Sequence, residues 1–209
     1  MEGSKEYFDM ESDRWDQLQD EFFSTSVRVK AYELVKPEAG KIAVDMGAGT
    51  GFVTEGLLPY GVKVIAIDQS QEMLDHLKEK LTGQGEITCI QADGMSLPLE
   101  NNSVDYAFAN MYLHHVESPE GAIRELYRIL KKGGKLVITD LDSHGFEFLI
   151  EEQHDKWLGF QRDDINFWFK SAGFSDISVN DTGMGCSSKS ECSCVSARIS
   201  IFAAYGEKI

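Results

Sequence analysis

A glycine-rich loop between a strand and a helix is the feature that most constrains how this chain can fold. The segment Val44-Asp45-Met46-Gly47-Ala48-Gly49-Thr50-Gly51 directly follows an apolar, strand-like run and directly precedes a helical pattern. Glycine lets the chain turn tightly, and it lets a ligand approach the backbone where any Cβ would collide. This order of elements is typical of open α/β folds that bind nucleotide-like cofactors.

The rest of the chain alternates between strand-like and helical patterns. Buried strands are expected at 41–46, 63–67, 87–92, 104–110 and 135–139, and connecting helices at 52–58, 71–81 and 119–130. Further along, we expect a helix at 163–172 and an antiparallel pair of strands at 176–179 and 198–205. The alternation predicts an α/β fold in which helices cover both faces of a mostly parallel sheet.

The chain length of 209 residues predicts a single domain with three special segments. Residues 1–34, with helices expected at 6–20 and 22–34, are rich in aromatic side chains and are expected to form a lid. Residues 141–163 are expected to be a substrate-side insertion, and residues 183–197 a cysteine-bearing hairpin loop.

Charge and composition narrow the classes of partner. The chain carries 35 acidic against 20 basic residues, for a formal net charge of −15. Such a field repels a phosphate backbone and an anionic membrane surface, so a small-molecule substrate is expected and nucleic acid is not. The apolar runs are too short for membrane insertion, and the four cysteines do not form a disulfide framework, so a cytoplasmic protein is expected. The oligomeric state is left open.

Polar residues stand where three of the expected strands end. Asp68, Asp93 and Asn110 close the second, third and fourth strands. The carboxyl ends of parallel strands meet at one edge of a sheet, where open α/β proteins bind ligands. Asp68 there could accept hydrogen bonds from both ribose hydroxyls of an adenine nucleoside, and Asp93 one from an adenine amino group.

A dinucleotide such as NAD(P) is the competing ligand for a glycine loop followed by an acid. The dinucleotide pattern places its third glycine three residues after the second, but here Gly49 and Gly51 are only two apart. Asp45 would also lie beside a pyrophosphate, whereas a carboxylate suits a cationic ligand. The pattern therefore favours a cationic nucleoside over NAD(P).

With these features the chain resembles the class I S-adenosylmethionine (SAM)-dependent methyltransferases of the ubiquinone/menaquinone-methyltransferase-like type. The resemblance implies a Rossmann-like seven-stranded sheet in the order 3-2-1-4-5-7-6, with the last strand antiparallel, and SAM as the cofactor. It implies that the glycine loop lies under the methionine part of SAM, Asp68 binds the ribose, Asp93 the adenine, and Asn110 lies under the methionine amino group. The full set of expected cofactor residues is Asp45, Gly47, Ala48, Gly49, Gly51, Asp68, Gln69, Ala92, Asp93, Gly94, Asn110 and Leu113.

The acceptor side is less constrained by the sequence. Methyl transfer needs positioning and, for a hydroxyl or carbon acid, a base. His114 or His115 could be that base, but either could equally serve in capping or packing. His144 and His154 could bind a metal or lie on a solvated surface, and no resident metal is expected. Tyr7 and Trp15 of the expected lid are candidate substrate contacts.

The late cysteines keep a second chemistry open. Cys186, Cys192 and Cys194 would emerge on the SAM side of the sheet if the family topology holds, and soft thiolates bind thiophilic metals and metalloids. Residues 152–160 also resemble methyltransferase domains associated with arsenic-responsive repressors. A thiol or metalloid methyltransferase and a non-catalytic SAM-binding sensor are therefore the two alternatives, against a flexible loop whose cysteines are incidental.

Overall fold

Seven strands form one sheet in the order β3-β2-β1-β4-β5-β7-β6 in the computed structural model, which describes residues 3–190 and 194–209. The strands are β1 (Ile42–Met46), β2 (Lys63–Asp68), β3 (Ile87–Gln91), β4 (Val104–Asn110), β5 (Leu130–Leu141), β6 (Phe174–Lys189) and β7 (Ser196–Lys208). β1 to β5 pair in parallel, and β7 runs antiparallel to both β5 and β6. The predicted fold class and strand order are confirmed.

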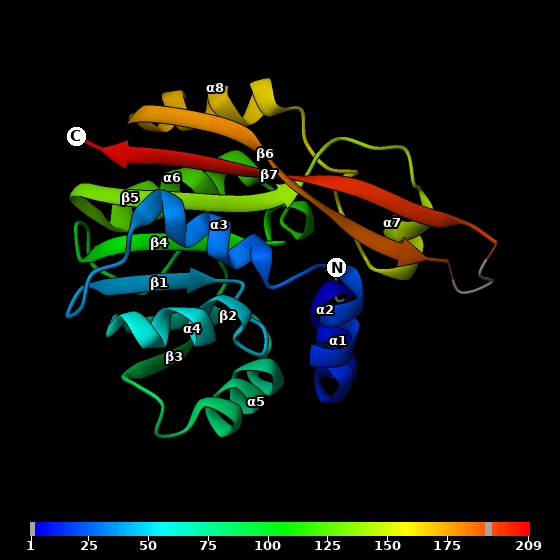
Figure 1. Ribbon diagram of the computed structural model, residues 1–209, viewed down its shortest axis with the longest axis horizontal. Coiled ribbons are helices and arrows are strands. Elements are labelled where there is room, and N and C mark those ends of the chain that lie inside the picture. Colours follow the sequence, from blue (N-terminus) through cyan, green and yellow to red (C-terminus); the bar gives the residue numbers. More distant parts are fainter. Residues whose placement is uncertain (1–2, 191–193) are drawn as a thin grey trace.

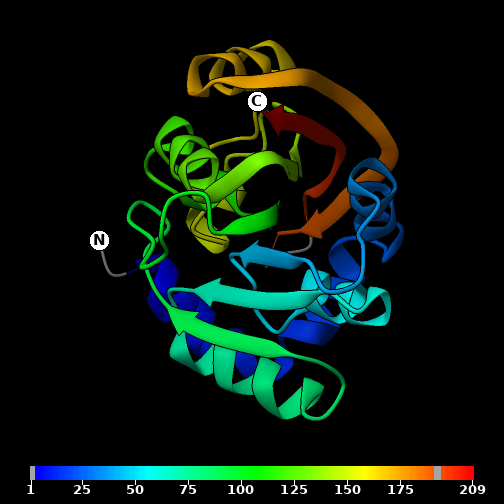
Figure 2. The same cartoon turned by 90° about the vertical axis from the view of Figure 1, so that its left-hand side faces the viewer.

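Helices cover both faces of this sheet (Figures 1 and 2). One face packs against α3 (Ser26–Val35), α4 (Phe52–Leu57) and α5 (Gln71–Leu81), and the other against α6 (Pro119–Ile129) and α8 (Arg162–Ala172). Successive strand residues feed opposite cores, because side chains alternate along a strand: Ala43 joins the first cluster and Val44 the second. Two short 3-10 helices, η2 (Leu58–Tyr60) and η3 (Leu113–His115), follow α4 and β4.

Short polar side chains and glycine set the helix ends. Ser70 Oγ accepts a hydrogen bond from Met73 N–H at 3.1 Å at the start of α5, and Ser118 Oγ accepts one from Gly121 N–H at 3.2 Å at the start of α6. Gly173 ends α8 with φ of +107°, a conformation that favours glycine. Ser118 and Gly173 thus set the start of α6 and the end of α8.

The N-terminal segment is divided differently from the prediction. In place of helices at 6–20 and 22–34, the chain forms α1 (Gly3–Glu11), η1 (Ser12–Arg14), α2 (Trp15–Phe22) and then α3. Ser12 Oγ donates a hydrogen bond to the Asp9 carbonyl at 2.9 Å where α1 gives way to the 3-10 turn, a local contact that competes with regular helix. α1 and α2 lie beyond the carboxyl ends of the strands rather than against a sheet face (Figure 1).

The C-terminal hairpin is longer than predicted, and its loop is shorter than 183–197. β6 continues to Lys189 and β7 begins at Ser196, so Cys186 lies in a strand, opposite Ile199. The small and polar residues of this stretch have the composition of a loop, but Met184 and Cys186 pack against the core while the backbone pairs with β7. Figure 1 shows this two-stranded ribbon extending past the end of β5.

The segment between β5 and α8 carries one short helix, α7 (Phe148–Glu152). Its two ends are held together by a bridge from Asp142 to Phe160 and by Arg162, whose Nε and Nη2 donate to the two Asp142 carboxylate oxygens at 2.7 and 2.6 Å. Among the described residues, no helix is long and apolar enough to cross a bilayer.

Candidate functional site

The glycine loop turns sharply at the carboxyl end of β1. Gly47, Gly49 and Gly51 have φ values of +68°, +51° and +97°, in the region that L side chains rarely adopt. The N–H groups of Gly47 and Ala48 both donate to the Ile67 carbonyl at 2.9 and 3.0 Å, which binds the loop to the end of β2. The three glycines are therefore required by the backbone itself.

Asp45 anchors the helix that follows the loop. Its side chain is buried, and its Oδ2 accepts hydrogen bonds from Thr54 N–H at 2.9 Å and from the Thr54 hydroxyl at 2.7 Å. Burial raises the pKa of Asp45 to about 6, although the bonds from Thr54 oppose the rise. The residue lines the cavity described below, but its hydrogen bonds hold α4 to β1.

Asp68 joins the loop to the next helix. One carboxylate oxygen accepts from Gly49 N–H at 2.9 Å and the other from Ser70 N–H at 3.0 Å. Burial raises its pKa, and these backbone donors counter the shift. Each oxygen keeps a further lone pair, so the carboxylate can still accept the two hydroxyls of a ribose.

A cavity of about 380 Å³ brings the sequence-predicted residues together at the strand ends. Those that line it are Tyr7, Trp15, Asp45, Gly47, Ala48, Gly49, Asp68, Gln69, Ala92, Asp93, Gly94, Asn110, His114, His115 and Cys186. Five predicted residues do not line it: Gly51, Leu113, His144, His154 and Cys194. Gly51 is the N-cap of α4, and Leu113 is fully buried in the second core cluster. Cys192 lies outside the described residues.

Tyr112 is a cavity residue that the sequence reasoning missed. A Cβ built on Gly94 would lie 1.8 Å from Tyr112 Oη, and one built on Gly47 would lie 2.5 Å from Tyr112 Cδ2. The ring therefore packs against two of the residues expected to contact the cofactor, in space that any larger side chain would fill. Its aromatic side chain does not distinguish Tyr112 from the other aromatic residues of the chain, so the sequence did not predict it as a cavity residue.

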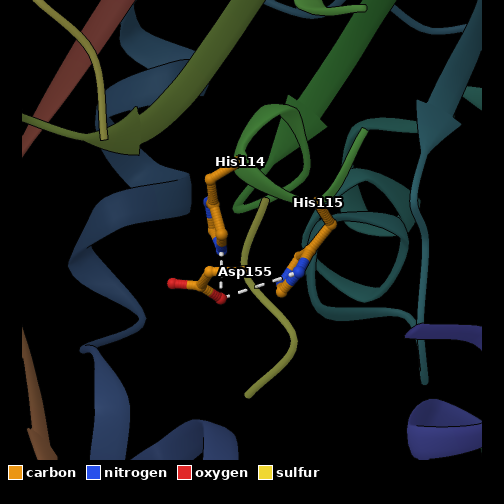
Figure 3. Close-up of side chains that lie close together, drawn as sticks. All are labelled: His114, His115 and Asp155. Atoms are coloured by element: carbon orange, nitrogen blue, oxygen red, sulfur yellow. Dashed lines mark ion pairs between the residues drawn. The ribbon is translucent and has the colours of Figure 1, made fainter. Parts of the chain in front are cut away.

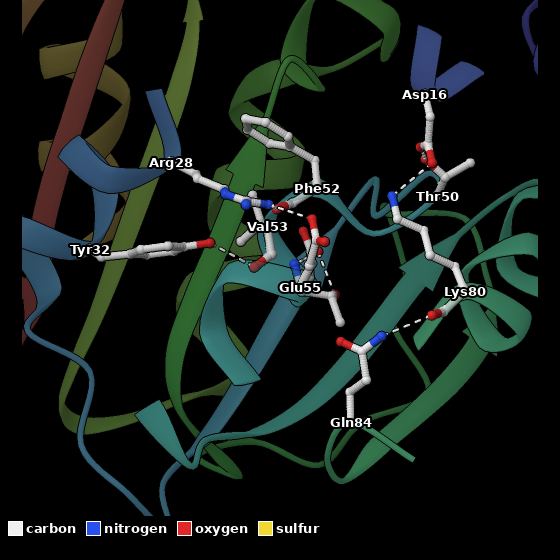
Figure 4. Close-up of polar contacts among 11 residues, drawn as sticks. Asp16, Arg28, Tyr32, Thr50, Phe52, Val53, Glu55, Lys80 and Gln84 are labelled. Atoms are coloured by element: carbon white, nitrogen blue, oxygen red, sulfur yellow. Dashed lines mark hydrogen bonds and ion pairs between the residues drawn. The ribbon is translucent and has the colours of Figure 1, made fainter. Parts of the chain in front are cut away.

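The N-terminal helices form the roof of the cavity. Phe8 makes an edge-on contact with His115 at 5.0 Å between ring centroids, and Trp15 Nε1 lies 3.5 Å from the Cβ position of Gly49. Asp16 accepts a hydrogen bond from the Thr50 hydroxyl and pairs with Lys80 at 2.8 Å, which fastens α2 to the glycine loop and to α5 (Figure 4). Residues of α1 and α2 thus line the cavity, and the role of residues 1–34 as a lid stays a prediction.

His114 is held by a buried carboxylate. Its Nδ1 lies 2.6 Å from Asp140 Oδ1, and Asp140 in turn accepts hydrogen bonds from Leu113 N–H and Leu141 N–H, both at 2.8 Å. Burial alone would lower the pKa of His114, but the Asp140 carboxylate outweighs it and the pKa rises to about 9. The Nδ1–H therefore points at Asp140, and Nε2 faces the other way.

His115 and Asp155 complete the acceptor end of the cavity. His115 Nδ1 lies 3.7 Å from Asp155 Oδ1, and His114 Nε2 lies 3.8 Å from the same oxygen. Burial and the neighbouring His114 ring lower the pKa of His115 well below its usual value, so His115 is neutral. Asp155 comes from the segment after α7; the sequence gave no signal for it, because only the folded loop brings it to the histidines.

The other predicted acceptor residues lie apart from this cluster. His144 Nδ1 accepts a hydrogen bond from Phe146 N–H at 3.3 Å, and the His154 ring contacts Tyr7 of the lid. Cys186 is a free, half-buried thiol whose pKa is raised to about 12, first by burial and then by nearby acids, while Cys194 is disulfide-bonded. The two described cysteines of the hairpin do not meet as a pair of thiolates.

Comparison with known proteins agrees with this geometry. A family model described as "Methyltransferase domain" matches residues 44–138, from β1 into β5. The chain is 34% identical over 116 residues to a demethylmenaquinone methyltransferase of Clavibacter sepedonicus, covering 56% of this chain and 47% of that one. It is 30% identical to 2-methyl-6-phytyl-1,4-hydroquinone methyltransferase 1, chloroplastic, of Oryza sativa subsp. japonica, covering 69% and 44%. The chain thus spans about half the length of the curated relatives it matches.

Solved structures share the fold. A SAM-dependent methyltransferase from Thermotoga maritima superposes with a TM-score of 0.70 at 23% identity and covers 100% of both chains. One from Aquifex aeolicus gives a TM-score of 0.64 at 22% identity, over 90% of this chain and 92% of that one. The strand order, the glycine loop at the end of β1 and these structures show that the chain has the fold of the class I SAM-dependent methyltransferases, and the match of residues 44–138 to the methyltransferase-domain model supports that family.

Proposed function

We propose that this protein transfers the methyl group of SAM to a small phenolic or hydroquinone-like acceptor. The observation that carries the proposal is one cavity with two chemically different ends. The glycine loop and Asp68 follow β1 and β2, whereas His114 and His115 follow β4, on the other side of β1 from β2, and form a buried cluster with Asp155; all of these segments contribute residues to the lining of the cavity. When bound, SAM supplies an electrophilic methyl group that needs a nucleophile in line with it.

The cofactor end fits SAM by its donor set. Asp68 has free lone pairs for the ribose hydroxyls, and Asp93 lines the same cavity, with one oxygen accepting from Met95 N–H at 3.0 Å. Gly47 and Gly94 let the Tyr112 ring pack against the backbone, because a Cβ at either position would enter the space that the ring fills. Asn110 lines the same cavity and accepts a hydrogen bond from the Thr139 hydroxyl at 2.7 Å, which fixes its amide orientation.

The acceptor end fits a hydroxyl-bearing aromatic molecule. Tyr7, Phe8 and Trp15 supply an aromatic roof. Neutral His115 has a buried Nδ1 with no hydrogen-bond partner among the described residues, so it can take the proton of an acceptor hydroxyl. Loss of that proton raises the electron density on the oxygen and on the ring carbons, which makes either atom a better nucleophile. The relatives named above act, by their names, on quinol-type molecules.

The test has two stages. Calorimetry with SAM measures cofactor binding, and then SAM with a tritiated methyl group is offered with hydroquinones, simple phenols, thiols and arsenite. Label in a hydroquinone or phenol supports the proposal. Tight SAM binding without transfer to any acceptor would favour a sensor, and transfer to arsenite or thiols that Cys186→Ser abolishes would favour the thiol chemistry.

A further inference from the structure

Three side chains at the acceptor end converge on one point (Figure 3). His114 and His115 come from η3, and Asp155 from the loop after α7, 40 residues further along the chain. The facing atoms are His114 Nε2, His115 Nδ1 and Asp155 Oδ1, and all three lie within 4.8 Å of one another. Two nitrogens and one oxygen thus surround a single buried spot in the wall of the cavity.

Two of these atoms have no hydrogen-bond partner within the described chain. Asp155 Oδ1 and His115 Nδ1 are buried and make no hydrogen bond, and the whole Asp155 side chain is only 2% exposed. A buried polar atom without a hydrogen bond destabilises the fold. A group bound between the two atoms would satisfy both.

We propose that His114, His115 and Asp155 bind one divalent transition-metal ion of the Zn²⁺ type. Two imidazole nitrogens with one carboxylate oxygen suit Zn²⁺ and its first-row neighbours, whereas Mg²⁺ and Ca²⁺ prefer oxygen ligands throughout. Ligands about 2.1 Å from a tetrahedral ion are about 3.4 Å apart. The two separations from Asp155 Oδ1, 3.7 and 3.8 Å, need to shrink by only a few tenths of an ångström, and the two histidine nitrogens, which lie within 4.8 Å of each other, have to approach to the same distance.

Asp140 supports this arrangement from behind. It binds His114 Nδ1 at 2.6 Å, and a ligand histidine in a metal site is oriented by such a carboxylate on its other nitrogen. Two backbone N–H groups fix Asp140 itself. Binding of the ion replaces the proton that His114 Nε2 carries in its charged form, and that proton passes to solvent.

Three protein ligands leave a coordination position open. All three residues line the cavity, so this position is accessible to an acceptor molecule. The role of the ion, though not its binding, rests on the proposed function: the acceptor hydroxyl binds the ion as an oxyanion and its proton goes to solvent. In the metal-loaded protein the ion thus promotes loss of the acceptor proton, which is the role of neutral His115 in the metal-free protein.

The experiment titrates tag-free, chelator-treated full chain with Co²⁺, whose visible absorption reports the number of its ligands, and measures metal per chain by elemental analysis. We expect one Co²⁺ per chain, displaced by Zn²⁺. His115→Ala and Asp155→Asn should each weaken binding by at least about 100-fold and Asp140→Asn by about 10- to 100-fold. His76→Ala, which removes a histidine on α5 outside the cluster, should bind as wild type does. Circular dichroism confirms that each variant is folded.

Equal binding by wild type and by the folded His115→Ala and Asp155→Asn variants would mean adventitious surface coordination and would overturn the inference. Absence of stoichiometric binding to wild type would overturn it as well. Since Co²⁺ binding is measured without SAM or acceptor, its failure is distinct from failure of the proposed function. If no Co²⁺ binds in the titration but methyl transfer continues at full rate in chelator, the metal inference fails and the proposed function still holds.

Discussion

The two ends of the cavity differ in how their polar groups are satisfied. At the cofactor end, Asp45 and Asp68 accept hydrogen bonds from Thr54, Gly49 and Ser70, so the site is complete before any ligand enters. At the acceptor end, Asp155 Oδ1 and His115 Nδ1 are buried without hydrogen-bond partners among the described residues. The carboxylates of the first end are held by hydrogen bonds within the chain, whereas the second end keeps two buried polar atoms without a hydrogen bond.

This difference matches what each end has to do. A rigid loop whose hydrogen bonds are already formed suits a cofactor that binds in every reaction cycle. A preorganised site loses less conformational entropy when the cofactor binds. Groups that must bind or deprotonate an acceptor have to stay free until it arrives, and keeping them free lowers the stability of the fold. Substitutions at the two ends should therefore separate cofactor affinity from transfer rate.

The largest effect should come from the unpaired end. His115→Ala removes the proposed proton acceptor and should lower the methyl-transfer rate by about 10²- to 10⁴-fold. SAM affinity, measured by calorimetry, should stay within about twofold of wild type, because this side chain lies away from Asp68 and the glycine loop. His76→Ala is the matched control for loss of one histidine. An equal fall in SAM affinity would erase the distinction between the two ends.

Asp45 should make the stability of the cofactor end depend on pH. Its pKa is raised from 3.8 to about 6 in the folded protein, so between these values the folded state holds a proton that the unfolded chain has released. Stability is therefore greater below pH 4 and falls as pH rises through 6, by on the order of 3 kcal/mol from this group. Asp45→Asn should remove that part of the fall. Urea unfolding of both proteins at pH 4 and pH 7 measures it, and parallel pH profiles would show that Asp45 ionises normally.

Asp68 should control cofactor affinity. Asp68→Ala removes the proposed ribose hydrogen bonds along with those to Gly49 and Ser70, and should weaken SAM binding by about 1–3 kcal/mol, or roughly 5- to 150-fold. The transfer rate at saturating SAM should change less than it does in His115→Ala. Unchanged affinity in calorimetry would place the ribose elsewhere in the cavity.

The smallest effect should come from the lid. Asp16→Ala removes the contacts to Thr50 and Lys80, and because the Asp16 side chain is half exposed the change should cost no more than about 1 kcal/mol in SAM affinity. Glu55→Ala is a matched control, since it removes the similarly exposed pair with Arg28, which joins α3 to α4 and not α2 to the glycine loop (Figure 4). If both variants weaken SAM binding equally, the lid contact has no specific role.

The cofactor end could be predicted from sequence because its signals are local. Gln71–Leu81 carries its helical period and its serine cap within a dozen residues, and the helix has the predicted bounds. The glycine loop and Asp68 are likewise each read from the strand that precedes them. Backbone requirements and strand ends are thus written in short stretches of the chain.

The acceptor end depends on contacts between distant segments, and it was predicted only in part. His114 and His115 were found because they follow a strand end. Asp155 reaches them through a loop whose path is set by tertiary contacts, such as Lys156 N–H donating to the His114 carbonyl at 2.8 Å. Residues 183–189 have the composition of a loop, yet pairing with β7 makes most of them strand. Neither the position of Asp155 nor the strand structure of residues 183–189 can be predicted from neighbouring residues alone.

The position of Tyr112 has a consequence for how affinity should be understood. Its ring lies where Gly47 and Gly94 leave space, so a ligand that fills this space displaces an aromatic side chain as well as water. The measured dissociation constant then includes the equilibrium between ring-in and ring-out states, and it exceeds the intrinsic constant by the reciprocal of the ring-out fraction. A smaller residue at position 112 would remove that competitor, so tighter binding could come from deleting a contact.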